Sequence, residues 1–284
     1  QPQHLALRRV APSASLFKII SGASLLQQGL KPDLLYPYRY AKRRITSRHL
    51  KPDKGSAKTD LASALAKSNN GFFAAAASKF INQDTLYKTA NDFGFNEPVP
   101  FAALVDPSLA TVPSDPLERA RMAAGFWHSQ LTPLHAAVIV QTVANGGHFV
   151  QPRLVDSVHH TSGVSHKAPK ASKQREVLSV AHAKALESGL RQAVSSGTAS
   201  RSFAKWKQKL PSIKVYGKTG TLGARLPDRT YTWFAGYMRG TQKDIVVAVL
   251  AINGEKWWRK APHIAHDLLT YHAKQMIEQS RKTR

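Results

Sequence analysis

Three apolar segments that follow one another near the C-terminal end constrain the fold of this chain more than any other feature. Residues 213–222, 230–238 and 245–252 each fit a strand, and only short segments separate them. Strands joined by short connections pair antiparallel, because a parallel pair needs a crossover of about a dozen residues or more. Helical patterns precede these strands, and a last helix is predicted over 261–278. This order predicts an α+β fold, with helices packed beside an antiparallel sheet.

The remainder of the chain alternates between helical patterns and irregular connections. Apolar residues at helical spacing predict helices over 15–28, 61–65, 72–80, 84–93, 117–127, 133–144 and 181–194. Polar segments rich in Pro, Gly, Ser or Lys predict loops over 31–58, 97–116 and 160–173, and 148–158 is predicted to be extended. We expect one domain over 1–284, with a mainly helical lobe at about 15–147 and a sheet-containing lobe at about 148–284. A ligand site is expected in the cleft between the lobes.

Three short motifs lie far apart in the chain. Residues 15–18 read S-L-F-K, residues 68–70 read S-N-N, and residues 218–221 read K-T-G-T. A serine hydroxyl becomes a good nucleophile only when a base removes its proton. If Ser15 opens a helix, Lys18 lies about one turn away on the same face. Burial and nearby positive charge could then lower the pKa of Lys18 until it acts as that base.

The patterns S-x-x-K, S-x-N and K-T-G, in that order, mark serine enzymes that are acylated by D-Ala-D-Ala peptides or β-lactams. The chain resembles the transpeptidase domain of a penicillin-binding protein, most closely the high-molecular-weight kind. Further stretches similar to this family are 59–70, 130–135, 144–147, 197–199 and 233–237, so the likeness runs from about residue 11 to 252. The resemblance implies the fold of penicillin-binding proteins and serine β-lactamases, an antiparallel sheet flanked by helices.

The resemblance implies a catalytic role for the side chains of Ser15, Lys18, Ser68 and Lys218. Ser15 would be the nucleophile, Lys18 its base and Ser68 a proton relay to the departing amine. The backbone N–H groups of Ser15 and Thr221 would form the oxyanion hole. Two simpler interpretations stay open: Ser15 and Ser68 could each serve only to cap a helix.

The third motif implies substrate contacts and the fourth catalytic residue, Lys218. Lys218 would attract the substrate carboxylate and lower the pKa of the first lysine, while Thr219 and Thr221 would offer hydroxyls to that carboxylate. Gly220 would let the ligand backbone lie close to the strand. Asn70 would bind the substrate backbone through its amide. In the simpler alternative, Lys218 is a solvated lysine on an edge strand.

The function implied by the resemblance is D,D-transpeptidation, in which peptidoglycan stem peptides are cross-linked through a serine acyl-enzyme that β-lactams inhibit. A D,D-carboxypeptidase would differ only in using water as the acceptor. A β-lactamase is a further alternative, although the chain shows no E-x-x-L-N element of class A enzymes. A penicillin-binding sensor or scaffold without turnover is the non-enzyme alternative. No cofactor is expected, and the implied partners are stem peptides and β-lactams.

The charge balance is strongly basic, with 41 Lys and Arg against 17 Asp and Glu, a formal net charge of +24. Nucleic acid is one partner that such a charge suggests, but no helix-turn-helix, zinc or RNP-like motif supports it. The basic residues are dispersed, with a local cluster at Lys42, Arg43 and Arg44. The charge therefore indicates either a plain solvated surface or attraction to anionic lipid or wall polymer.

Envelope location is expected from the family, at the periplasmic or outer face of the cytoplasmic membrane. No apolar window is long enough to span a membrane, and residues 1–10 contain no signal-peptide core. We expect any anchor to lie upstream of Gln1. Relatives also carry strands before the S-x-x-K helix, yet only 14 residues precede Ser15. Because 245–252 is apolar on both faces, we expect upstream residues, residues 5–10 or a partner chain to cover its free edge.

Two other features suggest ligands but are explained more simply. His263 and His266 have a spacing that suits a metal on one helix face, but no third ligand completes a site, so no metal is predicted. Trp257 and Trp258, followed by Arg259 and Lys260, could face lipid or pack against the following helix. The chain contains no cysteine, which excludes disulfides and thiolate metal sites.

Overall fold

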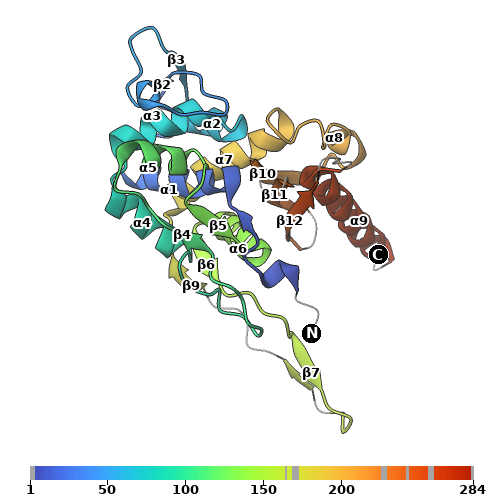
Figure 1. Cartoon of the computed structure of the whole chain (residues 1–284). Helices are drawn as coiled ribbons and strands as arrows, with labels where there is room; N and C mark the ends of the chain where they lie inside the picture. Colours follow the sequence, from blue (N-terminus) through green and yellow to red (C-terminus); the bar gives the residue numbers. More distant parts are fainter. Residues whose placement is uncertain are drawn as a thin grey trace.

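A computed structural model describes residues 4–163, 165–167, 173–224, 229–240, 243–254 and 259–282 (Figure 1). The α-helices are α1 (Lys18–Gln27), α2 (Leu61–Ala66), α3 (Asn70–Phe80), α4 (Gln83–Asp92), α5 (Pro116–Ala123), α6 (Pro133–Ala144), α7 (Val180–Ser195), α8 (Trp206–Lys209) and α9 (Ala261–Lys282). Three 3-10 turns are η1 (Leu5–Leu7), η2 (Ala14–Phe17) and η3 (Ser47–His49). The long strands are β10 (Lys214–Ala224), β11 (Arg229–Arg239) and β12 (Ile245–Asn253).

The other strands have two to four residues each. They are β1 (Ala11–Pro12), β2 (Tyr36–Tyr38), β3 (Ala57–Thr59), β4 (Leu109–Ala110), β5 (Ser129–Leu131), β6 (His148–Val150), β7 (Ser157–His159), β8 (Ser165–Lys167) and β9 (Lys173–Glu176). They pair in small antiparallel ladders, in the order β1-β5-β4 and as the pairs β2-β3, β6-β9 and β7-β8. Figure 1 shows β7 in an arm that projects from the body of the molecule.

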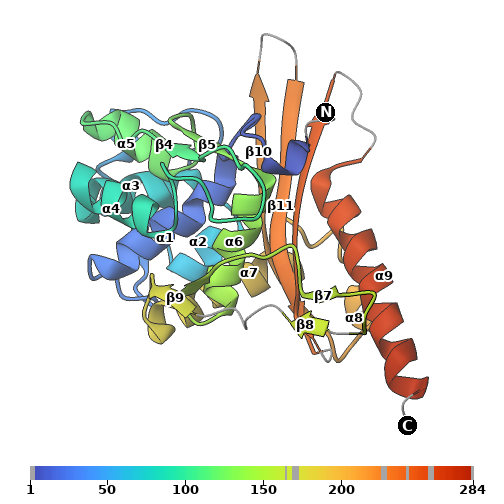
Figure 2. The same cartoon turned by 90° about the horizontal axis from the view of Figure 1, so that it is seen from below.

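The three long strands form one antiparallel sheet in the order β10-β11-β12. Figure 2 shows α9 on one side of this sheet and helices α6 and α7 on the other. Within β11, successive side chains point to opposite faces. Trp233 and Tyr237 join the core shared with the helical part, whereas Phe234 and Met238 join the core beneath α9. The sheet therefore separates two apolar cores and fixes the position of β10 against the helices.

The α+β fold expected from the sequence is confirmed, and the long strands lie within a few residues of their predicted limits. One prediction that bears on the site is wrong: Ser15 does not open an α-helix. It lies in the 3-10 turn η2, and α1 begins only at Lys18. Ala14 has a φ of +48°, a left-handed conformation that a regular helix does not allow.

Several segments predicted as irregular contain short ladders. The predicted loops 31–58 and 97–116 contain β2, the first two residues of β3, and β4. The predicted loop 160–173 contains β8 and the first residue of β9. The segment 148–158 is extended only in β6 and the start of β7. The helix predicted over 117–127 ends at Ala123, because Gly125 adopts a left-handed φ of +85° and Trp127 a left-handed φ of +46°.

The outer strand β12 has β11 on one side, and no other strand among the described residues pairs with its free edge. The segment 5–10, one of the covers expected from the sequence, does not form a ladder with β12. Its turn η1 packs against α6 instead. None of the described helices has a stretch long and apolar enough to cross a membrane.

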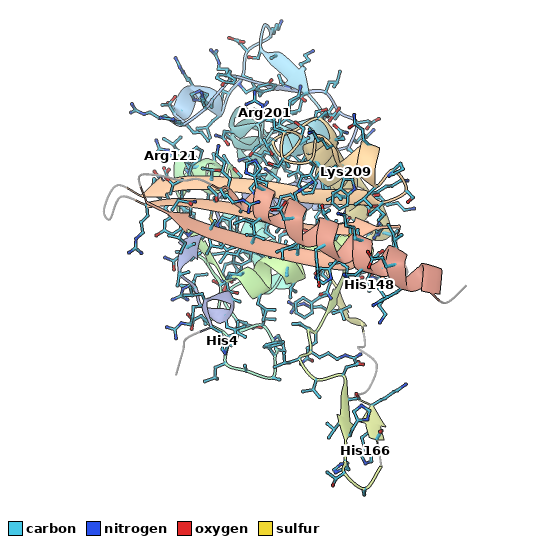
Figure 3. The ribbon with its side chains drawn as sticks, turned by 90° about the vertical axis from the view of Figure 1, so that its right-hand side faces the viewer. His4, Arg121, His148, His166, Arg201 and Lys209 are labelled. Atoms are coloured by element: carbon cyan, nitrogen blue, oxygen red, sulfur yellow. The ribbon has the colours of Figure 1, made fainter. Side chains whose placement is uncertain are left out.

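Basic residues occur on many different elements of the chain. Figure 3 shows Arg121, Arg201 and Lys209 on separate parts of the molecule. Arg43 and Arg44 are both exposed.

Candidate active site

The three motifs meet at one cavity of about 290 Å³ between η2, the turn from α2 to α3, and strand β10. Its lining residues are Ser15, Ser68, Thr198, Thr219, Gly220, Thr221, Thr232, Trp233, Lys260 and Pro262. None of these residues is acidic. Lys18 and Lys218 are both fully buried, beneath the cavity surface. The fold thus brings together residues that are separated by about two hundred positions in the sequence.

Lys18 is held at the centre of a hydrogen-bond cluster. Its Nζ lies 2.9 Å from Ser15 Oγ, 2.8 Å from Asn70 Oδ1 and 2.5 Å from the carbonyl oxygen of Ala124. The first contact joins the predicted nucleophile to the predicted base within hydrogen-bond reach. The other two fix the orientation of the amine, because two acceptors on different elements restrain the long lysine side chain.

Both lysines have a depressed pKa. Burial lowers the pKa of Lys18 well below its ordinary value of 10.5, and the positive charge of Lys218 lowers it further. Burial lowers the pKa of Lys218 to about 7. A charged ammonium loses hydration in a buried position, and a second cation nearby makes protonation still less favourable. Both effects favour the neutral amine of Lys18, which is the form that accepts a proton from serine.

Ser68 forms part of the cavity wall, in the turn between α2 and α3. It has a left-handed φ of +54°, unusual for a residue other than glycine. The alternative that Ser68 serves as the helix cap is wrong, because Asn69 caps α3 by accepting a hydrogen bond from the Phe72 N–H at 3.0 Å. The strained turn instead leaves the Ser68 side chain at the cavity, where it faces the same space as Ser15.

Asn70 connects Lys18 to a distant loop. While its Oδ1 accepts from Lys18, its Nδ2 donates to the carbonyl oxygen of Lys42 at 2.6 Å. Both ends of the amide are thus engaged within the protein. The expected contact of Asn70 with a substrate backbone stays a prediction, since the amide would have to exchange one of these partners for a ligand.

Strand β10 contributes the third motif from the edge of the sheet. Lys218 points into the core, so the alternative of a solvated lysine on an edge strand is wrong. Its Nζ donates to the carbonyl oxygen of Thr219 at 3.0 Å. On the other side of the strand, the Thr219 hydroxyl lies 2.6 Å from that of Thr198, and Thr221 is exposed. These hydroxyls line the cavity where a ligand carboxylate is expected.

The structure explains the glycine at position 220 by a contact other than the one predicted from the sequence. A Cβ at this position would lie 3.3 Å from Ala14 Cβ and 3.2 Å from Trp233 Cβ, which is closer than most such contacts. The glycine therefore lets η2 approach the sheet. The approach of a ligand backbone to Gly220 stays a prediction.

Sequence reasoning missed the residues that hold the nucleophile turn in place. Gly125 has a φ of +85°, and a Cβ there would lie 2.6 Å from the Ala14 carbonyl oxygen. Trp233 donates from Nε1 to the carbonyl oxygen of Pro12 at 2.9 Å. Ala124 contributes only its carbonyl oxygen, which every residue type carries, so its role cannot be recognised from the sequence. The Gly at 125 was the one available signal, and it fell inside a predicted helix.

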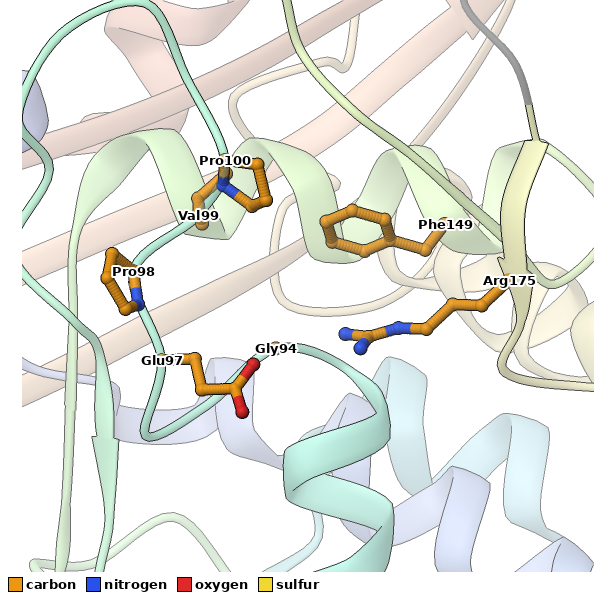
Figure 4. Close-up of a pocket in the computed structure, with 7 residues that line it drawn as sticks. All are labelled: Gly94, Glu97, Pro98, Val99, Pro100, Phe149 and Arg175. Atoms are coloured by element: carbon orange, nitrogen blue, oxygen red, sulfur yellow. The ribbon is translucent and has the colours of Figure 1, made fainter.

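A second cavity of about 270 Å³ contains none of the motif residues. Figure 4 shows the charged ends of Glu97 and Arg175 turned toward each other across it, beside Phe149. The Arg175 guanidinium lies over the Phe149 ring, 4.8 Å from its centroid. No serine, threonine or lysine lines this cavity, so it offers no nucleophile for acyl transfer.

The described residues contain no group of three or more His, Asp or Glu side chains placed to bind a metal ion. His266 packs edge-on against Phe203 and Trp206, and its Nδ1 lies 3.1 Å from a carboxylate oxygen of Asp267. This histidine thus takes part in aromatic packing. Trp257 and Trp258, considered above as a lipid-facing patch, lie outside the described residues.

Comparisons with known proteins agree with this arrangement. The family model described as the penicillin binding protein transpeptidase domain matches residues 2–270. A protein named penicillin-binding protein 3 from Bacillus subtilis is 30% identical over 203 residues, which cover 68% of this chain and 28% of that protein. Peptidoglycan D,D-transpeptidase PbpA of Mycolicibacterium smegmatis is 24% identical over 268 residues, covering 88% of this chain and 51% of that protein. The chain thus spans about half or less of these relatives.

Solved structures show the same fold. The D,D-transpeptidase domain of a peptidoglycan glycosyltransferase from Eggerthella lenta has a TM-score of 0.76 at 24% identity, covering 96% of this chain and 67% of that one. An imipenem acyl-enzyme complex of penicillin-binding protein A from Mycobacterium tuberculosis has a TM-score of 0.74 at 24% identity, covering 94% and 62%. The motifs, the cavity at which they meet and the family match together lead to one conclusion: this chain belongs to the penicillin-binding protein transpeptidase domain family.

Proposed function

We propose that this chain is a serine-type D,D-transpeptidase domain that acts on peptidoglycan stem peptides in the cell envelope. The observation that carries the proposal is the pairing of Ser15 Oγ with Lys18 Nζ at 2.9 Å, at a lysine whose pKa is depressed by burial. A hydroxyl beside a neutral amine is an activated nucleophile. The family match and the β-lactam acyl-enzymes among structures of similar fold support the same reaction class.

In the first half of the reaction, Lys18 removes the proton from Ser15 Oγ, and the oxygen attacks the carbonyl carbon of the penultimate D-Ala. The N–H groups of Ser15 and Thr221 stabilise the negative charge on the former carbonyl oxygen. When the tetrahedral intermediate collapses, its C–N bond breaks. The departing D-Ala amine receives the proton through Ser68, and an ester on Ser15 remains.

In the second half, the amine of a neighbouring stem peptide attacks the ester carbon. Its proton passes back to Ser15 Oγ, a new amide bond forms and the free serine is restored. The hydroxyls of Thr219 and Thr221 and the charge of Lys218 would hold the terminal carboxylate of the donor in the first half. If water replaces the amine, the same steps give D,D-carboxypeptidase activity.

The absence of an acidic residue from the cavity lining weighs against a β-lactamase. Rapid hydrolysis of an acyl-enzyme needs a base that activates water, and the described residues around Ser15 offer no carboxylate for this task. A β-lactam should therefore remain attached to Ser15 as a slowly hydrolysed ester.

The test is acylation by a fluorescent penicillin, followed by mass spectrometry. The intact chain should gain one stable adduct on Ser15, and Ser15→Ala should abolish it. Lys18→Ala should slow acylation by about 10²–10⁴-fold, the usual worth of base catalysis. Ser47→Ala and Lys31→Ala, both at exposed positions, serve as matched controls and should retain labelling.

Three outcomes would separate the alternatives. An adduct on a different serine would disprove the assigned nucleophile, and rapid release of the adduct would indicate a β-lactamase. A chain that is labelled but releases no D-Ala from stem peptides would be a sensor. Product analysis with and without an added amine acceptor distinguishes cross-linking from carboxypeptidase activity.

A further inference from the structure

The segment Lys42–Ile45 is anchored at both of its ends, and one anchor is a residue that contacts Lys18. The Lys42 carbonyl oxygen accepts from Asn70 Nδ2 at 2.6 Å, and Asn70 in turn contacts Lys18. The Ile45 carbonyl oxygen accepts from Arg121 Nε at 3.1 Å and from Nη2 at 2.9 Å. The backbone between these anchors is therefore positioned by the same elements that position the base.

The two residues between the anchors are both cations. Arg43 and Arg44 are exposed, and in the part of the chain that the structure describes neither forms an ion pair or a side-chain hydrogen bond. Arg121 differs, because it pairs with Glu118, which also contacts His128. Because a guanidinium presents a planar fork of N–H donors, two exposed arginines on an anchored backbone can bind an incoming anion.

These arginines line a pocket of about 140 Å³ that is separate from the cavity at Ser15. Its walls are Arg43, Arg44, Ile45, Arg121, Phe126 and Trp127, which we call the arginine pocket. Trp127 is 54% exposed and has a left-handed φ of +46°. Strained, exposed aromatic residues are found more often at ligand sites than elsewhere, and an indole face can support the apolar part of a ligand.

The arginine pocket and the Ser15 cavity have no lining residue in common, but one loop connects the pocket to the residues around Ser15. The loop that supplies Phe126 and Trp127 begins at Ala124, whose carbonyl accepts from Lys18, and continues through Gly125, which packs against Ala14 and Ser15. On the other side, Asn70 links Lys18 to Lys42. Both sides of the arginine pocket are therefore tied to the residues that position Ser15 and Lys18, so a ligand that reacts with Ser15 could extend a group toward it.

We propose that the arginine pocket is a subsite for an anionic group carried by the acyl donor. This rests on the proposed acylation of Ser15 and extends it to the recognition of substrate charge. Guanidinium groups present a planar fork of N–H donors that matches a carboxylate or phosphate. The anion can be borne by the donor itself or by a separate phosphate polymer, and the geometry favours the donor because one loop connects the pocket to the residues around Ser15.

The test uses two penicillins that differ by one charge. The penicillin nucleus is acylated on its amine with a glutaryl half-acid or with the methyl ester of that half-acid. Rates of Ser15 acylation are measured by mass spectrometry, and the ratio of half-acid to ester is compared between variants. We expect a ratio of about 5 in the wild-type chain, as for a favourable exposed ion pair.

The double variant Arg43→Gln with Arg44→Gln should bring the ratio to about 1, and the pair Arg43→Glu with Arg44→Glu should bring it below 1. The matched control is Arg48→Gln with Lys51→Gln, which removes the same charge from the same lobe at exposed residues outside the pocket. The control should keep the wild-type ratio. All variants are first compared by thermal unfolding.

A ratio unchanged by Arg43→Gln with Arg44→Gln, or lowered equally by the control pair, would overturn the proposal. A second arm adds soluble polyglycerol phosphate. If this polymer binds the wild type more tightly than the Arg43/Arg44 variant while the half-acid gains nothing, the site belongs to a wall polymer and the donor assignment is wrong. Failure of the proposed function is distinct, because it would appear as no Ser15 adduct with either penicillin.

Discussion

The decisive feature at the scale of single residues is the burial of two lysines. Lys18 and Lys218 have no exposed surface, and no carboxylate pairs with either of them among the described residues. Isolated buried charges are costly, so a lysine in such a position tends to lose its proton. Burial of Lys18 without an anionic partner therefore makes its amine able to act as a base at the cavity.

The depressed pKa of Lys218 predicts a pH-dependent stability. This lysine titrates at about 7 in the folded chain and near its ordinary 10.5 in the unfolded chain. Between these pH values the unfolded state binds more protons, so the free energy of unfolding rises with pH. Burial of Lys218 therefore costs most stability below pH 7, where its amine is charged in both states. Lys218→Met removes the titrating group. The free energy of unfolding of Lys218→Met should therefore fall relative to wild type between pH 7 and 10, by an amount on the order of 1 kcal/mol per pH unit.

Urea unfolding of both proteins at several pH values measures this difference. Lys67→Met, at an exposed lysine, is the control and should show no such trend. Because the comparison is made with wild type, changes in the overall charge cancel. A stability difference that does not vary with pH would mean that Lys218 titrates near its ordinary pKa in the folded chain.

At the scale of elements, the sequence predicts best where local signals agree. Helix α6 was predicted at its observed limits, because Thr132 caps it, Pro133 occupies its first turn and Asn145 with two glycines ends it. The long strands were found from their apolar runs. Ser15 and Ser68 line one cavity together with Thr219 and Thr221 of the third motif, and Lys218 is buried next to them in β10.

What could not be predicted depends on contacts between distant segments. The ladder β1-β5-β4 has two or three residues in each strand, too few for any periodic pattern. The turn η2 replaces the start of a helix because Ala14 is held in a left-handed conformation between Gly125 and the sheet. Such restraints come from packing, which overrides the helical pattern of residues 15–28.

The contact between Gly125 and η2 gives a prediction with a matched control. Gly125 and Gly163 both have a φ of +85°, but a Cβ at Gly125 would lie 2.6 Å from the Ala14 carbonyl oxygen, whereas nothing lies within 4 Å at Gly163. Gly163→Ala should cost only the backbone strain, about 1–2 kcal/mol. Gly125→Ala should cost more and should also displace Ser15, so that penicillin acylation slows by at least about tenfold.

Thermal unfolding and acylation rates measured side by side test this pair. Gly163→Ala should acylate at the wild-type rate. Equal acylation rates for Gly125→Ala and wild type would show that the loop after α5 does not position the nucleophile turn.

Strand β12 gives a second prediction at this scale. Its side chains contact α6 on one face of the sheet and α9 on the other, which suits a strand with neighbours on both sides. An open edge of this kind invites pairing with another chain. We therefore expect a further segment or partner to cover it. From Val246 to Leu250, alternate backbone amides point toward β11 and toward the free edge, and both of these alternating sets should then exchange slowly. Hydrogen exchange of the intact protein measures this, and rapid exchange of one alternating set would show that the edge is open.

At the scale of the whole molecule, the net charge of +24 is the property that the reaction does not explain. The basic side chains are distributed over separate parts of the molecule (Figure 3). A dispersed charge of this size acts at long range, up to about the Debye length of 8 Å at 0.15 M salt. An anionic lipid surface or wall polymer would thus attract many faces of the domain and would not require a specific pocket.

This predicts binding to anionic lipid vesicles that weakens steeply as salt is raised, with little binding to neutral vesicles. Replacing Lys42, Arg43 and Arg44 together by Gln should lower the affinity by about 1 kcal/mol for each charge that contacts the surface. Cosedimentation with vesicles at several salt concentrations measures both effects. Because the Arg48→Gln and Lys51→Gln control pair removes charges from the same dispersed surface, it should lower vesicle binding as well, in contrast to its expected lack of effect on the acylation ratio. Vesicle binding that is absent at low salt, or that does not change with salt, would show that the charge is only a solvated surface.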